Sequence, residues 1–516
     1  MQPEALPTFD DAPEWIDGIP GMRARIEPAG LALCDDRDRS WSELAEVVSA
    51  WKERLAALGV GPGDRVLVVG ENGPAAVALT FAVAATRGWI VNVNARLSAR
   101  EIDAIAAHAR PRLSLFLCAS PEARAYAERV GAREALDEGW GPIAWTAPDE
   151  SAPPEPCTGD PAQDVAALLY TTGTTGEPKG VMLTHRNLMF IAANSRALRR
   201  LEPRDRVYGL LPVSHVYGLA SVCLGTLFSG ASLHPQARFS PESMMRFVGE
   251  HRLTVCQGVP AMYAKLLEHL RAQGLRRFES TLRFLYAGGS PLSPALKRDV
   301  EAFFGLPLHN GYGLTEAAPT LTQTRPEAPR ADCSVGPAIP GVELRIVSRD
   351  GREVPRGGTG ELWARGPNVM KGYYRAPAAT AEALRPGGWL ATGDLARVGE
   401  DGAYFIEGRL KELIIRSGFN VFPVEVEAVL NSHPEVVQSA VVGRTVEGSE
   451  EVVAFVELAP GARASPQELI DFAGRSLAPY KRPSEVIVLP VLPAAANGKV
   501  LKGQLAARLR AQRAPS

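Results

Sequence analysis

Residues 168–179 read Leu168-Leu-Tyr-Thr-Thr-Gly-Thr-Thr-Gly-Glu-Pro-Lys179, and this stretch decides how the rest of the chain is interpreted. Three apolar residues run into six residues that are only Thr or Gly, and one lysine follows shortly after. Small residues let a backbone approach a ligand closely, while hydroxyls, N–H groups and a cation suit a polyphosphate. The stretch therefore predicts a phosphate-binding loop behind a strand at 165–170. It differs from the loop of P-loop NTPases, because no hydroxyl residue follows Lys179.

This loop is one of several segments that together resemble a known family. It is similar to the AMP-binding signature of the adenylate-forming superfamily, which includes acyl-CoA synthetases, luciferases and peptide-synthetase adenylation domains. Further segments resemble other motifs of that family, in the expected order: Tyr286-Ala-Gly-Gly-Ser-Pro291, Asn310-Gly-Tyr-Gly-Leu-Thr-Glu316, Gly388-Trp-Leu-Ala-Thr-Gly-Asp394 and Gly408-Arg-Leu-Lys-Glu-Leu-Ile-Ile415. Each one alone could be an ordinary turn or an exposed edge. In this order, across most of the chain, they are specific.

The resemblance implies a site for ATP, for Mg²⁺ and for the co-substrate coenzyme A. For ATP binding it implies Thr171, Thr172, Gly173, Thr174, Gly176, Tyr312, Thr315, Asp394 and Arg409. For catalysis at the transferring phosphate it implies Thr175, Lys179, Glu316 and Lys499, of which Glu316 and Thr175 would also hold the metal.

The residue types suit these implied roles. Tyr312 offers a flat face to adenine, and Glu316 is a hard oxygen ligand of the kind that Mg²⁺ prefers. Asp394 has two acceptor oxygens for the two ribose hydroxyls. We expect such groups to line a solvent-open cleft, so that their replacement impairs the use of ATP without unfolding the protein.

A second set of residues would surround the acyl group. The segment Leu211-Pro-Val-Ser-His-Val-Tyr-Gly218 resembles the pocket segment of the family. The resemblance implies an acyl pocket formed by His215, Tyr217, Gly288, Gly289 and Gly311. The glycines indicate a roomy, largely apolar pocket, and a histidine in an apolar run can also be a plain core residue. These segments contain no arginine that would pair with a second carboxylate, and they leave fatty and arylalkanoic acids equally open.

The last hundred residues resemble the mobile C-terminal domain of the family. Lys411 would be the hinge, and Ser417, Gly418 and Phe419 would line the tunnel for coenzyme A. Lys499, in Asn497-Gly-Lys499, resembles the lysine that bridges the substrate carboxylate and the α-phosphate. The chain departs from the family at Ala494-Ala-Ala, where a basic residue and a threonine are usual.

Length and composition indicate the fold class. A chain of 516 residues is too long for one core, and we expect a domain of residues 1–410 and a domain of residues 411–516. Strand-like runs alternate with helical patterns, which include a buried helix expected at 75–85 and a capped helix expected at 465–472. Gly and Pro are frequent between 328 and 409. The expected fold is therefore α/β. It has a large N-terminal domain of layered α/β subdomains plus a β-rich subdomain, and a small mobile α/β C-terminal domain.

Charge and targeting signals limit the partners. Lys and Arg total 56 against 58 Asp and Glu, and the net charge of −2 gives no footprint for nucleic acid. The N-terminus does not look like a signal peptide, and the apolar run 75–85 is shorter than the ~20 residues that a membrane helix needs. The six scattered cysteines suggest buried free thiols. We expect a cytoplasmic enzyme without a transmembrane segment, and a homodimer is one option for its oligomeric state.

The sequence thus predicts an ATP-dependent acid–thiol ligase that makes acyl-CoA from a hydrophobic acid, fatty or arylalkanoic. Within the family, the rival is an enzyme that loads the acyl group onto a carrier-protein thiol. A luciferase-type oxygenase is a further option and needs a special substrate. From another class, the chain could be a non-catalytic nucleotide-binding module, although the complete motif set argues against that.

Overall fold

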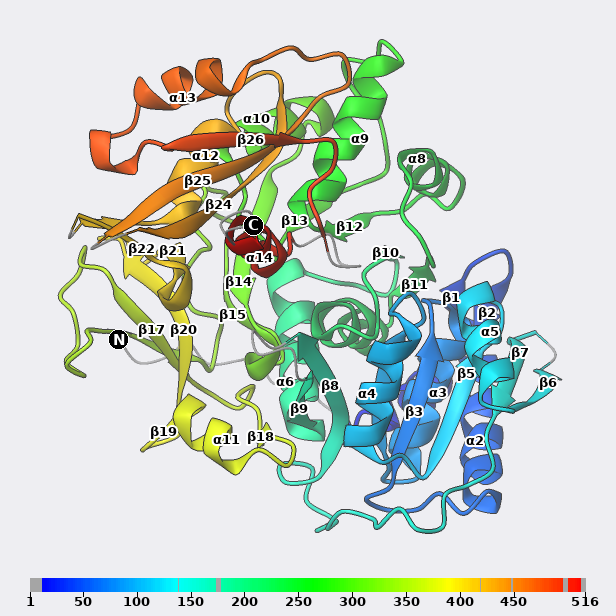
Figure 1. The fold of residues 1–516 in the computed structure, drawn as a ribbon. Coiled ribbons are helices and arrows are strands. Elements are labelled where there is room, and N and C mark those ends of the chain that lie inside the picture. Colours follow the sequence, from blue (N-terminus) through cyan, green and yellow to red (C-terminus); the bar gives the residue numbers. More distant parts are fainter. Residues whose placement is uncertain are drawn as a thin grey trace.

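The computed structural model describes residues 12–137, 139–172, 178–417, 419–446, 449–494 and 500–511, with only the backbone of residues 134–137, 172 and 511. Two eight-stranded sheets form the body of the molecule, and a smaller β-rich sheet follows them along the chain. The C-terminal residues form a two-stranded sheet and a three-stranded sheet with helices of their own, and most of this part is drawn in orange and red in the upper half of Figure 1.

The first sheet has a parallel interior. Its strand order is β15 (Thr320–Gln323), β14 (Leu308–Gly313), β13 (Phe284–Ala287), β12 (Val255–Gly258), β10 (Arg206–Gly209), β11 (Ser232–Pro235), β1 (Leu31–Cys34) and β2 (Asp38–Ser40). The strands from β14 to β1 pair in parallel, and only the outer strands β15 and β2 pair antiparallel. The intervening helices supply the crossovers that parallel strands require.

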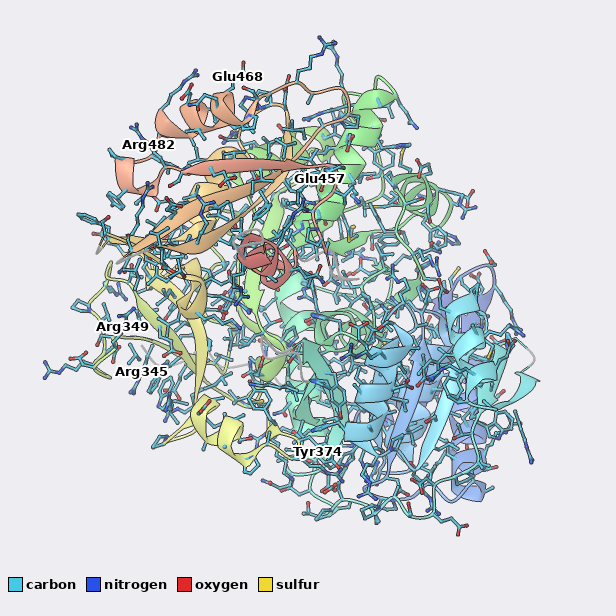
Figure 2. All side chains as sticks on the ribbon, viewed as in Figure 1. Arg345, Arg349, Tyr374, Glu457, Glu468 and Arg482 are labelled. Carbon is cyan, nitrogen blue, oxygen red and sulfur yellow. The ribbon has the colours of Figure 1, made fainter. Side chains whose placement is uncertain are left out.

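The second sheet repeats this plan. Its order is β18 (Gly372–Tyr373), β9 (Pro178–Thr184), β8 (Val165–Thr172), β4 (Trp89–Asn94), β3 (Arg65–Gly70), β5 (Leu113–Leu117), β7 (Gly141–Trp145) and β6 (Arg133–Asp137). Strands β8, β4, β3 and β5 are parallel, and the strands at both edges are antiparallel. The segment after β18 is anchored here, since the ring of Tyr374 packs on Trp89 with centroids 5.7 Å apart (Figure 2).

Helices and short helical turns connect these strands. They are α1 (Gly18–Ile26), α2 (Trp41–Ala57), α3 (Pro74–Ala85), α4 (Ala99–Ala109), α5 (Pro121–Arg129), α6 (His185–Arg199), η1 (Tyr217–Leu224), α7 (Gly225–Ser229), α8 (Pro241–Glu250), α9 (Pro260–Ala272), α10 (Pro294–Phe304) and η2 (Thr315–Ala317). One apolar cluster includes residues of both large sheets, and α3 and η1 are buried within it. The apolar run 75–85 is therefore a buried helix, as predicted.

The β-rich subdomain contains β16 (Glu343–Val347), β17 (Gly360–Arg365), β20 (Trp389–Val398), β19 (Leu384–Arg385) and β21 (Tyr404–Arg409), with the short helix α11 (Pro377–Ala383). Its strands are antiparallel. Arg345, labelled at the left edge of Figure 2, places its guanidinium 4.3 Å from the ring centroid of Trp389. The predicted change from α/β to mainly β structure after residue 328 is confirmed.

The C-terminal part has its own cores. It contains η3 (Leu410–Glu412), β22 (Ile414–Arg416), β23 (Phe419–Val421), α12 (Pro423–Leu430), β24 (Val436–Val446), β25 (Ser449–Leu458), α13 (Pro466–Gly474), η4 (Pro479–Lys481), β26 (Glu485–Leu489) and α14 (Lys502–Ala511). Two apolar clusters consist of residues 414–509. Ser465 and Glu468 form the predicted capping box at the start of α13 (Figure 2). The domain boundary between 410 and 411 stays a prediction.

The expected α/β fold class, with its β-rich subdomain and small C-terminal domain, is confirmed. Among the described residues, no helix combines the length and the apolar character that crossing a bilayer requires. The expectation of buried thiols is wrong for Cys157, which is exposed, while Cys333 is half-buried and the other four cysteines are buried. Cys157 lies in the polar connector before β8, where its Sγ donates to Asp164 over 2.9 Å.

Candidate active site

Asp394 is the centre of a three-residue network, which we call the aspartate network: Tyr312, Asp394 and Arg409. Strands β20 and β21 are antiparallel, and their register places Asp394 opposite Arg409. Arg409 Nε lies 3.1 Å from Asp394 Oδ1, and the Tyr312 hydroxyl donates to Asp394 Oδ2 over 2.5 Å. A carboxylate oxygen can accept more than one hydrogen bond, so Asp394 retains acceptor capacity for the hydroxyls of a ribose.

Burial distinguishes this network from the predicted open cleft. Asp394 is only 5% exposed, so the expectation of a solvent-open position is wrong for this residue. Its two partners compensate for the lost hydration. Burial, followed by the Asp394 charge, raises the pKa of Tyr312 well above its usual value. Burial disfavours the charge of Arg409, but Asp394 and then Glu412 outweigh it and raise the pKa of that guanidinium.

Replacing Asp394 by asparagine is expected to raise the KM for ATP about 10- to 100-fold, because a hydrogen bond to a charged group contributes about 1.5–3 kcal/mol. Tyr312→Phe removes one hydrogen bond and leaves the carboxylate, so its effect should be smaller. Initial rates at varied ATP concentration, with melting curves of both variants, check this. A lowered melting temperature with an unchanged KM for ATP would assign Asp394 a purely structural role.

A second group, which we call the glutamate–lysine cluster, consists of Glu316, Tyr373 and Lys179. Tyr373 lies on β18, which pairs with β9, the strand that carries Lys179. The Tyr373 hydroxyl donates to Glu316 Oε1 over 2.7 Å, and Lys179 Nζ lies 5.5 Å from the centroid of the tyrosine ring. Burial, and next the Glu316 charge, raises the pKa of Tyr373, so the hydroxyl stays a donor at neutral pH.

The two groups share one electrostatic environment. The Glu316 carboxylate is among the charges that raise the pKa of Arg409. Burial and then Arg409 lower the pKa of Lys411, and Lys179 contributes in the same direction. The two groups are also joined through the chain, because Tyr312 on β14 and Glu316 on the following turn η2 are close in sequence. Carboxylates and cations of both groups thus belong to one region, and this suits the predicted binding of a nucleoside triphosphate.

The phosphate loop lies at the end of a hairpin. Strands β8 and β9 are antiparallel, with Thr171 opposite Lys179 and Thr172 opposite Pro178. The described backbone thus brings both ends of the predicted loop next to the glutamate–lysine cluster. Several predicted site residues lie outside the described residues: Gly173, Thr174, Thr175, Gly176, Gly418 and Lys499. Their predicted roles stay predictions, as does the role of the Thr172 side chain.

The residues beside the loop fit Mg²⁺. Glu316 lies on the short turn η2, and its backbone carbonyl accepts from the Met370 N–H over 2.9 Å. Its carboxylate is a hard oxygen donor, and Mg²⁺ is commonly held by one or two such groups together with substrate phosphates. Thr315, the predicted phosphate contact beside it, is 8% exposed.

Two tyrosines occupy the predicted acyl pocket. Tyr217 on η1 and Tyr286 on β13 have ring centroids 6.0 Å apart in an edge-to-face arrangement. A Cβ added at Gly311 would lie 2.0 Å from the Tyr286 hydroxyl oxygen, and one at Gly288 would lie 3.0 Å from the same ring. Gly289 has a φ of +83°, which favours glycine. Gly288 and Gly311 therefore make room for the Tyr286 side chain. The sequence had suggested that this room was open to the ligand.

The segment that carries His215 is held by one asparagine. Asn72 Nδ2 donates to the carbonyls of residues 209, 210 and 211 over 3.0, 3.1 and 2.9 Å, and its Oδ1 accepts from the Val213 N–H over 2.9 Å. His215 follows directly and is half-buried, and its Nδ1 lies 3.4 Å from the Tyr217 backbone nitrogen. Asn72 thus fixes the position of the predicted wall of the acyl pocket.

Buried polar groups lie beside the tyrosine pair. Arg199 is 1% exposed, donates to the Ser221 carbonyl over 3.0 Å and lies 5.0 Å from the ring centroid of Tyr286. Gln257 pairs with Tyr286 in the sheet register and is fully buried. Among the described residues, both polar atoms of its amide and the Tyr217 hydroxyl have no hydrogen-bond partner. Such groups are costly unless a ligand or water satisfies them.

The predicted hinge and the predicted tunnel for coenzyme A belong to the start of the C-terminal part. Lys411 is exposed on the turn η3 between β21 and β22. Ser417 has a φ of +50° and its N–H donates to Ser449 Oγ over 2.8 Å. Phe419 is 55% exposed and stacks on Tyr480 with centroids 4.6 Å apart. An aromatic ring held in this exposed position is available to a ligand.

Lys502 connects the hinge turn to the C-terminal core. Its Nζ lies 2.7 Å from Glu427 Oε1 and 3.2 Å from Glu412 Oε2. Burial disfavours the ammonium charge, but Glu427 and then Glu412 outweigh it and raise the pKa of Lys502. This lysine lies three residues after the predicted catalytic Lys499, at the first position of α14.

Replacing Lys502 by methionine is expected to destabilise the C-terminal part by about 1–3 kcal/mol, between the values for exposed and buried ion pairs. Lys481→Met is the matched control, because its partner Glu425 is more exposed (41% of the side chain) and the loss should be smaller. Hydrogen exchange of peptides from α12 and α14 measures the loss of stability in both variants. Equal protection in the two variants would contradict the connecting role.

Several of these residues were not identified from the sequence: Asn72, Arg199, Gln257, Tyr373 and Lys502. Their surroundings come from distant parts of the chain, such as Glu316 for Tyr373 and residues 209–213 for Asn72. The one local signal was Gly70-Glu-Asn-Gly73, a polar turn directly after a buried strand.

Comparison with known proteins shows the family of the chain. The chain matches the AMP-binding enzyme family over residues 22–374 and the AMP-binding enzyme C-terminal domain over residues 425–499. It is 36% identical to a feruloyl-CoA synthase of Amycolatopsis over 96% of this chain and 99% of that protein. It is 34% identical to an indoleacetate–CoA ligase of Aromatoleum aromaticum over 96% of this chain and 98% of that protein.

A solved structure extends the comparison. The o-succinylbenzoate coenzyme A synthetase of Bacillus subtilis, in complex with ATP and a magnesium ion, superposes with a TM-score of 0.80 at 29% identity. The match covers 95% of this chain and 99% of that one. The chain therefore belongs to the AMP-binding enzyme family, in which an AMP-forming acyl-CoA synthetase is the class that fits it.

Proposed function

We propose that the chain is an acid–CoA ligase that activates a hydrophobic carboxylic acid with ATP to its acyl-AMP and then transfers the acyl group to coenzyme A. The products are acyl-CoA, AMP and pyrophosphate. The observation that carries the proposal is the pair of hydrogen-bonded groups, the aspartate network and the glutamate–lysine cluster, which β14 and the turn η2 connect. Together they supply acceptors for a ribose, an oxygen ligand for Mg²⁺ and a cation for phosphate.

The proposed chemistry depends on charge neutralisation and positioning. The carboxylate of the acid is already ionised at neutral pH, so no general base is needed for its attack on the α-phosphorus of ATP. Two anions must approach each other, and Lys179 and Lys499 would offset their repulsion. Glu316 would hold Mg²⁺, which neutralises part of the triphosphate charge when it is bound. The acyl-AMP is a mixed anhydride, so a thiolate can attack its carbonyl carbon with AMP as the leaving group.

Within the proposed class, an arylalkanoic acid with a polar ring substituent fits this pocket better than a fatty acid. The rings of Tyr217 and Tyr286 offer edges and faces to an aromatic group. The Gln257 amide and the Tyr217 hydroxyl, without partners among the described residues, would pair with a hydroxyl, carbonyl or N–H on that ring. Relatives named for feruloyl and indoleacetate groups support the same class. A fatty acid would leave these buried polar groups unsatisfied.

Two other functions remain to be tested against this one. An acyl-AMP ligase would use the same ATP site and pass the acyl group to a carrier-protein thiol. A non-catalytic nucleotide-binding module would bind ATP without releasing pyrophosphate. The names of the relatives support free coenzyme A as the acceptor, and the cytoplasm as the place of action is part of the proposal.

Thioester formation with a panel of acids tests the proposal. The panel pairs arylalkanoic acids with and without a ring hydroxyl, and includes fatty acids of similar length; the acceptors are free coenzyme A and a phosphopantetheinylated carrier protein. We expect the highest kcat/KM for a polar-substituted aryl acid with free coenzyme A. Gln257→Leu should reduce the preference for the ring substituent about tenfold. Acyl transfer to the carrier protein alone would overturn the proposed acceptor.

A further inference from the structure

Three side chains meet at the first sheet: Cys34, His234 and His251. Cys34 is far from the two histidines in the sequence. Cys34 ends β1, His234 lies on β11, which is the neighbouring parallel strand, and His251 follows the last residue of α8. One ligand atom from each residue lies within 4.8 Å of the other two. Cys34 Sγ is 3.3 Å from His251 Nδ1, and the two histidine rings have centroids 5.2 Å apart.

The hydrogen bonds of His234 leave one ring nitrogen available. Ser232 Oγ lies 3.3 Å from the Asp205 carbonyl, which only accepts, and 3.1 Å from His234 Nε2. Both bonds exist together only if the hydroxyl donates to the carbonyl and receives the Nε2–H of the histidine. That tautomer leaves Nδ1 with a lone pair. His234 is fully buried, and Nδ1 has no hydrogen-bond partner among the described residues.

This arrangement has the properties of a metal ligand set. A histidine that binds a metal usually donates its other N–H to a neighbouring acceptor, which fixes the ring, and Ser232 supplies that acceptor here. Cys34 and His234 are both buried, so a metal held between them would be shielded from water.

We propose that Cys34, His234 and His251 form a zinc-binding site that joins β1, β11 and the end of α8. Tetrahedral zinc with Zn–S near 2.3 Å and Zn–N near 2.0–2.1 Å places sulfur and nitrogen ligands about 3.3–3.6 Å apart. The separation of 3.3 Å between Cys34 Sγ and His251 Nδ1 matches this spacing. The fourth position would hold water beside Asp38, which lies opposite Cys34 on β2.

Binding of the metal replaces one proton. Zn²⁺ displaces the proton of the Cys34 thiol, and this proton leaves to solvent. The thiolate and two neutral imidazoles then coordinate the metal. The assembled site would carry a net charge of +1, and Asp38 lies opposite Cys34 in the pairing of β1 with β2. The site is separate from the predicted Mg²⁺ ligands, so the proposal does not depend on the proposed function.

Cobalt titration of the full chain tests the site. The protein is stripped with a chelator and titrated with Co²⁺, which reports a thiolate ligand by a near-ultraviolet charge-transfer band and tetrahedral geometry by strong visible bands. We expect about one equivalent with both signals, and loss of both when Zn²⁺ is added. Co²⁺ at a site with only oxygen ligands gives no thiolate band. The band therefore distinguishes binding at Cys34 from binding beside Glu316.

Variants complete the test. Cys34→Ser should abolish the thiolate band, and His251→Gln, at a half-buried position, should weaken cobalt binding at least about tenfold. Cys157→Ser removes the exposed thiol and should change neither result. If Cys34→Ser fails to fold, His251→Gln alone decides. Absence of a thiolate band in the unmodified chain, or its persistence at full strength in His251→Gln, would overturn the proposal in favour of a hydrogen-bonded core cluster.

Discussion

Replacing Lys499 by alanine is expected to lower the rate of acyl-adenylate formation about 10²–10³-fold, the usual loss for one preorganised group at a developing charge. The reason is the repulsion between the acid and the α-phosphate, which a cation at the transferring phosphate must offset. Lys179, beside Tyr373 and Glu316, is unchanged in this variant, so the measured loss reports the cation at position 499. Pyrophosphate exchange dependent on the acid measures this step.

The second half-reaction separates this role from a general loss of structure. Thioester formation from supplied acyl-AMP should stay within a few-fold of the unmodified enzyme, since no phosphate is transferred in that step. Lys499→Arg should recover part of the exchange rate, and Arg510→Ala, an exposed cation on α14, should leave both steps unchanged. Equal loss of both half-reactions in Lys499→Ala would contradict the assigned role.

Replacing Lys411 by proline is expected to lower the rate of thioester formation about 10²-fold or more, which is the usual cost of a misplaced reacting group. Acyl-adenylate formation should largely continue. In the proposed mechanism, one face of the C-terminal domain would bring Lys499 to the phosphate, and another would bring residues 417–419 to the thiol. Both would not be in place together, so the proposal requires a rotation about a few backbone angles. Lys411 lies on the turn η3 at the predicted domain boundary, and proline fixes φ there.

The control separates backbone freedom from the charge of the side chain. Lys411→Ala removes the ammonium group and leaves φ free, so both half-reactions should continue. Stopped assays of pyrophosphate exchange, and of thioester formation from supplied acyl-AMP, compare the two variants. Unimpaired thioester formation in Lys411→Pro would show that this chain does not alternate between two domain orientations.

Local sequence patterns predicted those parts of the fold that depend on local physics. The apolar run 75–85 predicted a buried helix, because every face of it is apolar, and α3 is buried throughout. Ser465 and Glu468, three residues apart, predicted the capped start of α13. The run of Thr and Gly before Lys179 predicted a loop behind a strand at 165–170; β8 is that strand, and the structure adds β9 as its hairpin partner.

The sequence could not predict how the site is closed. Asp394 was expected at a solvent-open cleft, but the β20–β21 register puts Arg409 opposite it and Tyr312 donates to its other oxygen. Tyr373 reaches Glu316 only because β18 adds to the edge of β9. Contacts of this kind depend on strand order, and the local spacing of apolar residues in the sequence does not predict strand order.

The same limit applies to the proposed zinc site. No close cysteine–histidine spacing indicates it, since Cys34 and His234 become neighbours only through the pairing of β1 with β11. Sequence motifs for zinc rely on ligands that are near one another in the chain. Sites assembled from distant strands must be found from the fold.

The most direct test of the central claim, activation of the acid as its acyl-AMP, follows the carboxylate oxygens. The acid that is most active in the panel is labelled with ¹⁸O in both carboxylate oxygens and converted to the thioester with ATP and coenzyme A. Attack of the carboxylate on the α-phosphorus predicts that one labelled oxygen appears in AMP, with unlabelled pyrophosphate. Label in inorganic phosphate together with ADP, or unlabelled AMP, would contradict the account.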